Sequence, residues 1–370
     1  MMAKGKTPTG TPPAPADSAA KPESGREVSF SADLSRGFMA WFEQFNATIA
    51  ITTYQVGKVI FFGIKPDKSL WVFNRNLGRC LGMASDETGF WVAGNHSLYR
   101  FGNLAAGDAS GLKDGDALFA PRMSYFTGDV DAHDIGLDGD ARPVFVNTLF
   151  NCLARPSMTS SFEPVWMPPF ISRLAAEDRC HLNGLAMVDG APGYVTAVST
   201  SDTFDGWRDQ RRDGGVVIDV RSNEIVCTGL SMPHSPRWHD GRLWLHNSGT
   251  GEFGFADLDA GRFEAVAFCP GYLRGLAFMG DFAVVGLSMP RGNKTFSGLA
   301  LDDQMASRKM QPKAGLYFIN LKTGDIAHAI TLGGLVTELY DVTVLTDMKQ
   351  PSMVGLADPQ NARLIALPTR

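Results

Sequence analysis

The chain has 370 residues, of which 44% are hydrophobic and 20% are charged, so it can bury a sizeable core and does not have the composition of a disordered protein. Its formal net charge of −5 excludes the overall basic field of a dedicated nucleic-acid-binding protein. No run of about 20 apolar residues occurs, so we expect no membrane span and no membrane partner.

The N-terminal part changes character near residue 28. Residues 1–27 are rich in Pro, Ala, Gly, Ser and Lys, and we expect a disordered leader, because they offer little apolar surface to bury. Residues 28–370 are expected to form a single domain. Within residues 30–46 the aromatic side chains have helical spacing, which predicts a short helix that caps the rest of the fold. These aromatic residues are Phe38, Trp41, Phe42 and Phe45.

After residue 46 the chain consists of short runs of β-branched and aromatic residues separated by turn residues, which is typical of strands. We expect no long amphipathic helix there. The predicted strands cover residues 48–51, 58–63, 70–73, 89–93, 97–101, 143–147, 194–198, 216–220, 243–246, 282–287, 315–319, 327–331, 339–345 and 353–356.

A short strand with the pattern x-x-Gly-Leu-Ala recurs along the chain, and a polar or aromatic residue leads into each copy. A related strand at residues 338–342 lacks the glycine. A repeat of about 40 to 55 residues that is built from strands indicates a β-propeller. The lead residues are Arg79, His133, His181, His234 and Tyr272.

The two ends of the chain are expected to close the propeller. Residues 47–73 match the second, third and fourth strands of a blade, whereas residues 338–345 match an inner strand. Joining them gives six blades. Residues 352–367 could add two strands, which leaves seven blades open. The predicted fold class is therefore all-β: a six-bladed β-propeller, with seven blades possible, and a short N-terminal helix.

Three of the lead residues are histidines from consecutive blades. In a propeller, the starts of the inner strands lie around the axis on one face, so His133, His181 and His234 should meet there. Three imidazoles form a facial site for a divalent transition metal (Fe, Cu, Zn or Mn) with positions left open for substrate. The alternatives are that each histidine only caps a strand, or that one acts as a general base without a metal.

Other polar residues are expected on the same face, because the ends of the second strands are more polar than an exposed hairpin requires. Two long loops, residues 201–214 and 288–314, add basic side chains that suit a carboxylate or phosphate, although a solvated loop is the alternative. The candidate acid–base residues are Glu252, Glu338 and Asp341. The candidate substrate-binding residues are Gln55, Asn147, Asn183, Trp207, Arg208, Arg237, Asn247, Tyr272, Arg274 and Arg291.

Four phrases of the sequence resemble an uncharacterised bacterial family of conserved hypothetical proteins, some of which are attached to tetratricopeptide repeats. The resemblance covers roughly residues 40–357 and implies a propeller but no reaction. The phrases are Thr52-Thr53-Tyr54-Gln55-x-Gly57-Lys58, His181-Leu182-Asn183-Gly184, Met232-Pro233-His234-Ser235-Pro236-Arg237 and Asn247-Ser248-Gly249-Thr250-Gly251-Glu252.

At the level of the fold, the chain is also similar to the gluconolactonase-like and streptogramin-lyase-like six-bladed propellers. That similarity implies a divalent metal or a catalytic histidine in the funnel. The lactonases use a metal site of carboxylates and asparagines, whereas this chain offers histidines, so we do not expect lactonase activity.

These observations predict a metal-dependent enzyme, an oxidoreductase, lyase or hydrolase, with a three-histidine site that acts on a small anionic or peptide substrate. A non-enzymatic module that binds a ligand or peptide and a metal-free lyase or hydrolase are the alternatives. The five cysteines are scattered singly and odd in number, which favours reduced thiols and a cytoplasmic location. The N-terminus also lacks the apolar segment of a secretory signal.

Overall fold

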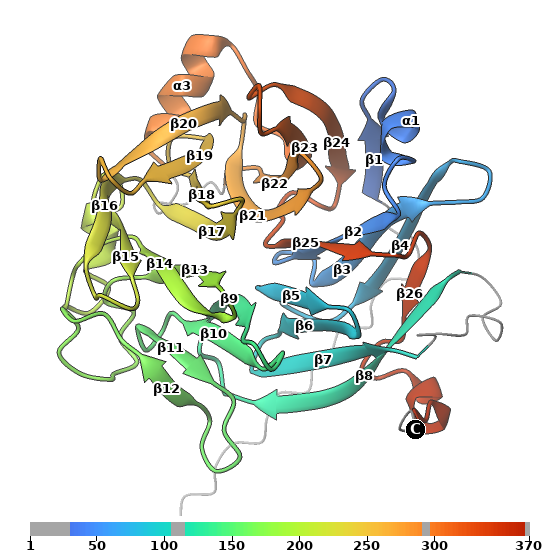
Figure 1. The fold of residues 1–370 in the computed structure, drawn as a ribbon, viewed down its shortest axis with the longest axis horizontal. Helices are drawn as coiled ribbons and strands as arrows, with labels where there is room; N and C mark the ends of the chain where they lie inside the picture. The colour runs from blue at the N-terminus through green and yellow to red at the C-terminus, as the bar shows by residue number, and fades with distance from the viewer. Residues whose placement is uncertain (1–29, 105–114, 291–296, 367–370) are drawn as a thin grey trace, which may run out of the picture.

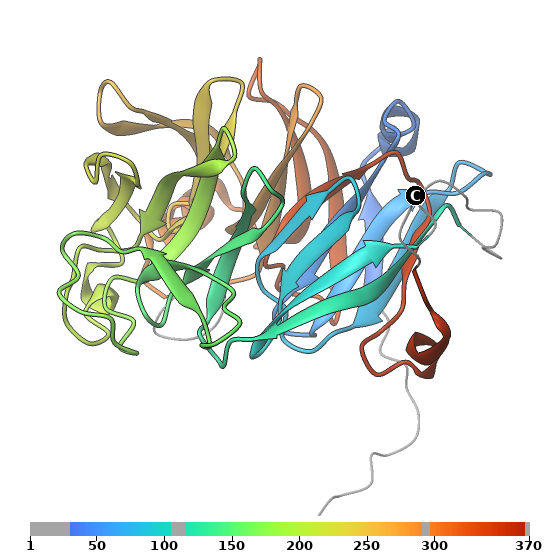
Figure 2. The same cartoon turned by 60° about the horizontal axis from the view of Figure 1, so that its bottom comes forward.

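Six small antiparallel sheets stand in a ring around one axis, which confirms the predicted six-bladed β-propeller (Figure 1). The computed structural model describes residues 30–104, 115–290 and 297–366. The expected leader at residues 1–27 and the candidate Arg291 lie outside these ranges. Figure 2 shows the same disc tilted toward its side, with loops extending from both faces.

Each blade begins with an inner strand at the axis, and later strands lie progressively farther out. The blade that joins the two ends of the chain contains β25 (Val342–Thr346), β2 (Ala47–Thr53), β3 (Lys58–Ile64) and β4 (Leu70–Asn76). The second contains β5 (Met83–Asp86), β6 (Gly89–Ala93), β7 (Ser97–Asn103), β8 (Ala117–Phe126) and β26 (Pro351–Met353). The third contains β9 (Ala132–Leu137), β10 (Pro143–Asn147), β11 (Cys152–Arg155) and β12 (Glu163–Trp166).

The remaining three blades follow the same plan. The fourth contains β13 (Leu182–Val188), β14 (Ala191–Ala197), β15 (Gly215–Asp219) and β16 (Ile225–Leu230). The fifth contains β17 (Pro233–His239), β18 (Arg242–Asn247), β19 (Glu252–Asp257) and β20 (Arg262–Phe268). The sixth contains β21 (Tyr272–Met279), β22 (Phe282–Ser288), β23 (Ala314–Asn320), β24 (Ile326–Gly334) and β1 (Phe30–Leu34).

Both ends of the chain take part in the ring. β25 pairs antiparallel with β2, so a C-terminal inner strand completes an N-terminal blade. The following β26 pairs parallel with β8 and extends an existing blade, so the tail does not build a seventh. The chain then ends in the 3₁₀ helix η1 (Pro359–Arg363). The seven-blade alternative is therefore wrong.

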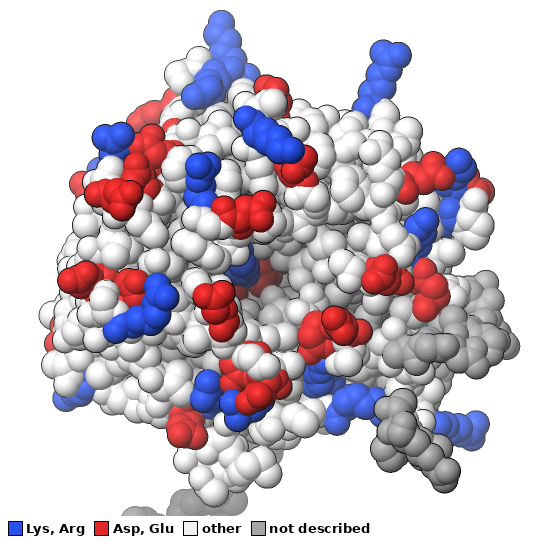
Figure 3. All heavy atoms as spheres, in the orientation of Figure 1, with Lys and Arg blue, Asp and Glu red and all other residues white. Residues whose placement is uncertain are grey.

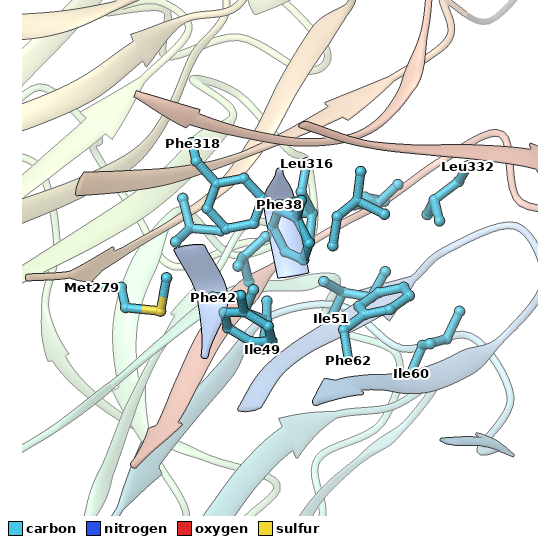
Figure 4. Packing of buried hydrophobic residues seen from close by; sticks show 14 of the residues in the cluster. Phe38, Phe42, Ile49, Ile51, Ile60, Phe62, Met279, Leu316, Phe318 and Leu332 are labelled. Atoms are coloured by element: carbon cyan, nitrogen blue, oxygen red, sulfur yellow. The ribbon is translucent and has the colours of Figure 1, made fainter. Parts of the chain in front are cut away.

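The N-terminal helix is present but shorter than the aromatic spacing in residues 30–46 suggested. Residues 30–34 alternate between half-buried and exposed side chains and form β1, which pairs with β24. Only Phe38–Phe42 form the helix α1. Figure 4 shows Phe38 and Phe42 packed among apolar side chains of the first and sixth blades, including Ile49 and Phe318. The aromatic residues are thus spaced to fill this junction between blades.

Two further short helices lie in the long loops, α2 (Trp207–Gln210) and α3 (Ala300–Arg308). In residues 30–104, 115–290 and 297–366 no helix is both long and apolar enough to cross a membrane. All five cysteines are buried and free of disulfides.

Hydroxyl groups at the ends of second strands connect neighbouring blades. Each donates a hydrogen bond of 2.6 to 3.0 Å to a backbone carbonyl at the start of the next inner strand. We call these contacts staples. Some of the polar residues at second-strand ends, which suggested a ligand-binding site, therefore hold neighbouring blades together. The four staples are Thr52 Oγ1 to Leu81 O, Thr148 Oγ1 to Leu182 O, Ser248 Oγ to Leu273 O, and Ser288 Oγ to Leu339 O.

An ion cluster on the axis, here called the clasp, consists of Asp134, Arg237 and Asp341. Arg237 donates to both oxygens of Asp134 at 2.7 and 3.0 Å, and it lies 3.4 Å from Asp341. Asp134 also accepts the backbone N–H of Leu185, and Asp341 accepts that of Met83. Three side chains and two backbone groups thus tie five blades together. This contact set occupies Arg237 and Asp341, which the sequence suggested for substrate binding and catalysis.

The face of the disc seen in Figure 3 has Asp and Glu side chains gathered around a central hollow. Turns between first and second strands supply acidic residues, because Asp accepts backbone N–H groups in tight turns. These turn residues include Asp86, Glu87, Asp138, Asp140, Asp189 and Asp240.

Candidate functional site

The starts of the inner strands bring six side chains together around the axis. We call this group the collar, and its members are at most 8% exposed. The rings of His133 and His181 lie 4.9 Å apart, and His133 lies 5.6 Å from Tyr340. The collar consists of His133, His181, His234, Tyr272, Arg274 and Tyr340.

The other side of the collar is built around a cation. The Arg274 guanidinium carbon lies 4.7 Å from the Tyr340 ring centroid and 5.4 Å from that of Tyr272. Tyr272 in turn contacts His234 edge-on, with ring centroids 5.7 Å apart. The three histidines that the sequence placed at the axis therefore share one buried region with Arg274 and two tyrosines.

The backbone that leads into the collar is strained at several non-glycine residues. His181 itself has φ +51°, and Asp178 and Asp131 have φ of +41° and +51°. Left-handed conformations of this kind are costly for residues with a Cβ and concentrate where side chains must be held in particular directions. The strain at His181 is thus a local indication of a functional position.

His181 is held on two sides. Its Nδ1–H donates to Asp178 Oδ2 at 2.9 Å, and Trp207 Nε1–H donates to the same oxygen at 2.9 Å. The Trp207 ring also stacks on the imidazole, with centroids 4.1 Å apart. Burial raises the pKa of Asp178, but its electrostatic interaction with His181 and the hydrogen bonds from His181 and Trp207 lower it to a net value below the usual range. An ionised Asp178 thus fixes the ring and leaves Nε2 for a ligand.

His133 and His234 are neutral at physiological pH. Burial lowers the pKa of His133 to about 4, against the opposing effect of Asp131, whose backbone carbonyl accepts from His133 Nδ1–H at 2.9 Å. Burial and then the charge of Arg274 lower the pKa of His234 well below its ordinary value. His234 Nε2 accepts a hydrogen bond from Asn183 Nδ2 at 3.1 Å.

The collar meets part of the requirement for a metal site. His133 and His181 each use Nδ1 on an oxygen acceptor and keep Nε2, which is how metal-bound histidines are usually held. The corresponding nitrogen of His234 is already bonded to Asn183. Within the described ranges, no three His, Cys, Asp or Glu side chains are arranged to hold one metal ion. The three-histidine metal site therefore stays a prediction.

Of the three acid–base candidates, Glu252 and Asp341 form no hydrogen bond or ion pair with a collar histidine in the described part of the chain. Glu252 accepts a hydrogen bond from Thr250 and lies beside Gln304 of α3. Glu338 is half-buried in the segment before β25. Asp341 follows Tyr340 directly in the sequence and belongs to the clasp.

The substrate-binding candidates divide into two groups. Asn183, Trp207, Tyr272 and Arg274 are in the collar or touch it. The others have separate contacts in the structure. Gln55 accepts from Thr337, Asn147 from the Phe150 N–H, and Asn247 from the Ser231 N–H, while Arg208 pairs with Asp205 and Arg237 with Asp134.

Sequence reasoning missed Asp178, Asp131 and Tyr340. Asp178 lies three residues before His181 in an irregular segment, and only the left-handed backbone brings its carboxylate back to the imidazole. Tyr340 leads an inner strand without the glycine of the repeat, and its position, equivalent to that of His133, was not recognised.

The chain belongs to the family described as a domain of unknown function, DUF4915, whose model matches residues 36–354. Among curated proteins, none matches the chain. Solved structures with similar folds include a nidogen/laminin complex, at 11% identity and a TM-score of 0.52, covering 81% of this chain and 99% of that chain.

Two further structures have lower TM-scores. One is a catalytically inactive virginiamycin B lyase from Staphylococcus aureus with quinupristin, at 12% identity and a TM-score of 0.39, covering 82% of this chain and 99% of the other. The other is a protein of unknown function from Bacteroides caccae, at 8% identity and a TM-score of 0.38, covering 81% and 98%. Likeness at such identities concerns the fold alone.

Proposed function

We propose that the collar is the active site of an enzyme that acts on a small anionic substrate, with His181 as its general base. The observation that carries this proposal is the fixed position of His181 between the Asp178 carboxylate and the Trp207 ring. A carboxylate on Nδ1 selects one tautomer and stabilises the imidazolium that forms when Nε2 takes a proton. A histidine that only capped a strand would not need this support.

The charges around His181 support an anionic substrate. Arg274 is a buried arginine, 7% exposed, whereas His133 and His234 are neutral near pH 7. Asp178 is already compensated by its hydrogen bonds from His181 and Trp207. An anionic substrate in the collar would lie close to the Arg274 guanidinium, in a region of low dielectric constant where the attraction between opposite charges is strong. The five buried, free cysteines support a cytoplasmic location.

A metal-dependent reaction is the second candidate, and the Nδ1 hydrogen bonds of His133 and His181 favour it. These two histidines would hold the ion, and His234 would join them after exchanging its contact with Asn183. A bound divalent metal would supply Lewis-acid or redox chemistry at its open positions. Elemental analysis of protein purified without a His tag tests this candidate, and His181→Ala should abolish stoichiometric metal uptake.

Exchange of hydrogen with solvent tests the general-base proposal without knowledge of the product. The protein is incubated in D₂O with a pooled metabolite extract, and mass spectrometry follows both deuterium incorporation and changes in abundance. We expect the wild type to label or convert at least one anionic metabolite. His181→Gln should reduce this rate at least about 100-fold, because general bases contribute factors of about 10² to 10⁴.

His239→Gln is the matched control, because His239 lies at the other end of an inner strand and stacks on Phe278, outside the collar. It should leave the rate unchanged. If the wild type neither labels nor converts any metabolite, the enzyme proposal fails and the binding-module alternative is favoured. Equal loss of activity in both variants would also contradict a specific role for His181.

A further inference from the structure

Among the described residues, the hydroxyl of Tyr340 in the collar and Oδ1 of Asn183 beside it are buried polar atoms that have no hydrogen-bond partner. Their residues are 5% and 2% exposed. Folded proteins pair the great majority of their buried polar atoms, so unpaired ones call for an explanation, such as a missing ligand. Both side chains contact collar histidines, Tyr340 through His133 and Asn183 through His234.

The contacts of Asn183 fix which atom is unpaired. Its Nδ2 donates to the backbone oxygen of Pro233 at 2.8 Å and to His234 Nε2 at 3.1 Å. The backbone oxygen of Pro233 can only accept, so the amide cannot be turned over without placing oxygen against oxygen. The unpaired atom is therefore Oδ1, which can only accept a hydrogen bond. An occupant of the site must supply a donor to it.

The Tyr340 hydroxyl, in contrast, can donate a hydrogen bond to an occupant of the site. Burial keeps the pKa of its phenol well above the ordinary value, although Arg274 beside it acts in the opposite direction, so the hydroxyl retains its proton. The guanidinium lies over the Tyr340 ring at 4.7 Å. A proton donor next to a buried cation is suited to an oxygen that carries negative charge, because hydrogen bonds to charged groups are the stronger ones.

We propose that the collar takes a small carboxylate that also carries a hydroxyl or ammonium group. The carboxylate accepts hydrogen bonds from the Tyr340 hydroxyl and Arg274, and the second group donates to Asn183 Oδ1. This inference rests on the proposed function for the location of the site and names the class of its substrate. It assigns Tyr340 and Asn183 as specificity residues, because each is unsatisfied until such a compound enters.

Calorimetric titration with four probes at neutral pH tests the assignment: lactate, alanine, propionate and inorganic phosphate. We expect lactate or alanine to bind at least about tenfold more tightly than propionate, which lacks the second group. Asn183→Ala should remove this preference, whereas Tyr340→Phe should weaken lactate and propionate alike. Asn147→Ala is the matched control, since Asn147 is also buried with an unpaired amide nitrogen but makes its hydrogen bond to Phe150.

The outcomes separate this inference from the proposed function. His181→Gln should retain the binding preference while losing deuterium exchange, since His181 serves the reaction. If the wild type shows the preference but no exchange, the general-base proposal fails and the ligand class stands. If phosphate or propionate binds as tightly as lactate and alanine, if no probe binds, or if Asn183→Ala keeps the preference, the inference is overturned.

Discussion

The collar and the clasp lie at two levels of the same axis and treat buried polar groups in opposite ways. In the clasp, every charged group faces an opposite charge or a backbone N–H. In the collar, Tyr340 and Asn183 keep unpaired atoms and the neighbouring backbone is strained. The two levels use adjacent residues of the chain, His133 beside Asp134 and Tyr340 beside Asp341. One residue of each pair thus stabilises the ring, and we propose that the other contacts a ligand.

The clasp is asymmetric in itself. It has one cation for two carboxylates, and Arg237 lies closer to Asp134 than to Asp341. Burial raises the pKa of Asp341 above its usual range; the charge of Arg237 opposes this, and Asp134 adds to it. Arg237 therefore pairs mainly with Asp134, and Asp341 is protonated more easily than an exposed aspartate. This assignment gives Asp134 the larger structural role.

The sharpest test of the comparison is to remove each carboxylate. Asp134→Ala leaves the Arg237 charge buried with its weaker partner and frees the backbone N–H of Leu185, so we expect a loss of about 3 to 5 kcal/mol of unfolding free energy. Asp341→Asn should cost less. Urea unfolding followed by fluorescence measures both. Equal losses would contradict the asymmetry, and a loss after Asp134→Ala no larger than that after His181→Gln would remove the distinction between clasp and collar.

The collar should make stability fall in acid. The folded pKa of His133 is about 4, below the value of about 6.5 in an unfolded chain, so only the unfolded state gains the proton as the pH falls below about 6.5. His133 thus contributes a loss of about 2 kcal/mol between pH 8 and pH 5. The His133→Gln variant has no imidazole at this position and should not show this loss. Between pH 8 and pH 5 the unfolding free energy of the wild type should therefore fall by about 2 kcal/mol more than that of the variant.

Urea unfolding of wild type and His133→Gln at both pH values measures this change. The raised pKa of Asp341 acts in the opposite direction, because its folded form gains the proton first and is stabilised as the pH falls. That contribution is common to both proteins and therefore cancels when their stabilities are subtracted, as does that of His246. A stability difference between the two proteins that is the same at pH 8 and pH 5 would show that His133 is not held neutral.

The staples should be weaker than the clasp but still measurable. Thr148→Val removes a buried hydroxyl and leaves the Leu182 carbonyl without its 2.7 Å hydrogen bond, so we expect a loss of about 1 to 2 kcal/mol. Thr159→Val is the control, because Thr159 is exposed, and its effect should stay within about 0.5 kcal/mol. Equal effects would mean that the staple adds nothing to the junction between blades.

The repeat made the ring of blades and its closure predictable, because inner-strand spacing follows from local sequence. Contacts between blades were harder to predict from the sequence. The hydroxyls at second-strand ends have the same residue types whether they staple blades or bind a ligand, and only the register distinguishes Thr148 from a site residue. Arg237 was assigned to substrate because it is a basic residue near the start of an inner strand, yet its side chain belongs to the clasp. The contact of Asp178 with His181 requires a left-handed backbone that could not be predicted from the residue types.

The smallest expected effect has the opposite sign. In the absence of ligand, Tyr340→Phe removes a buried hydroxyl that has no partner and keeps the ring against His133 and Arg274, so we expect a gain of about 1 kcal/mol in unfolding free energy. Tyr317→Phe, at a buried tyrosine of another cluster, gives the reference for simple loss of a hydroxyl. A gain at Tyr340 together with weaker carboxylate binding would show that this hydroxyl is retained at the expense of stability, as expected of a binding site. A loss of stability would place Tyr340 with the clasp, among the residues that hold the ring together.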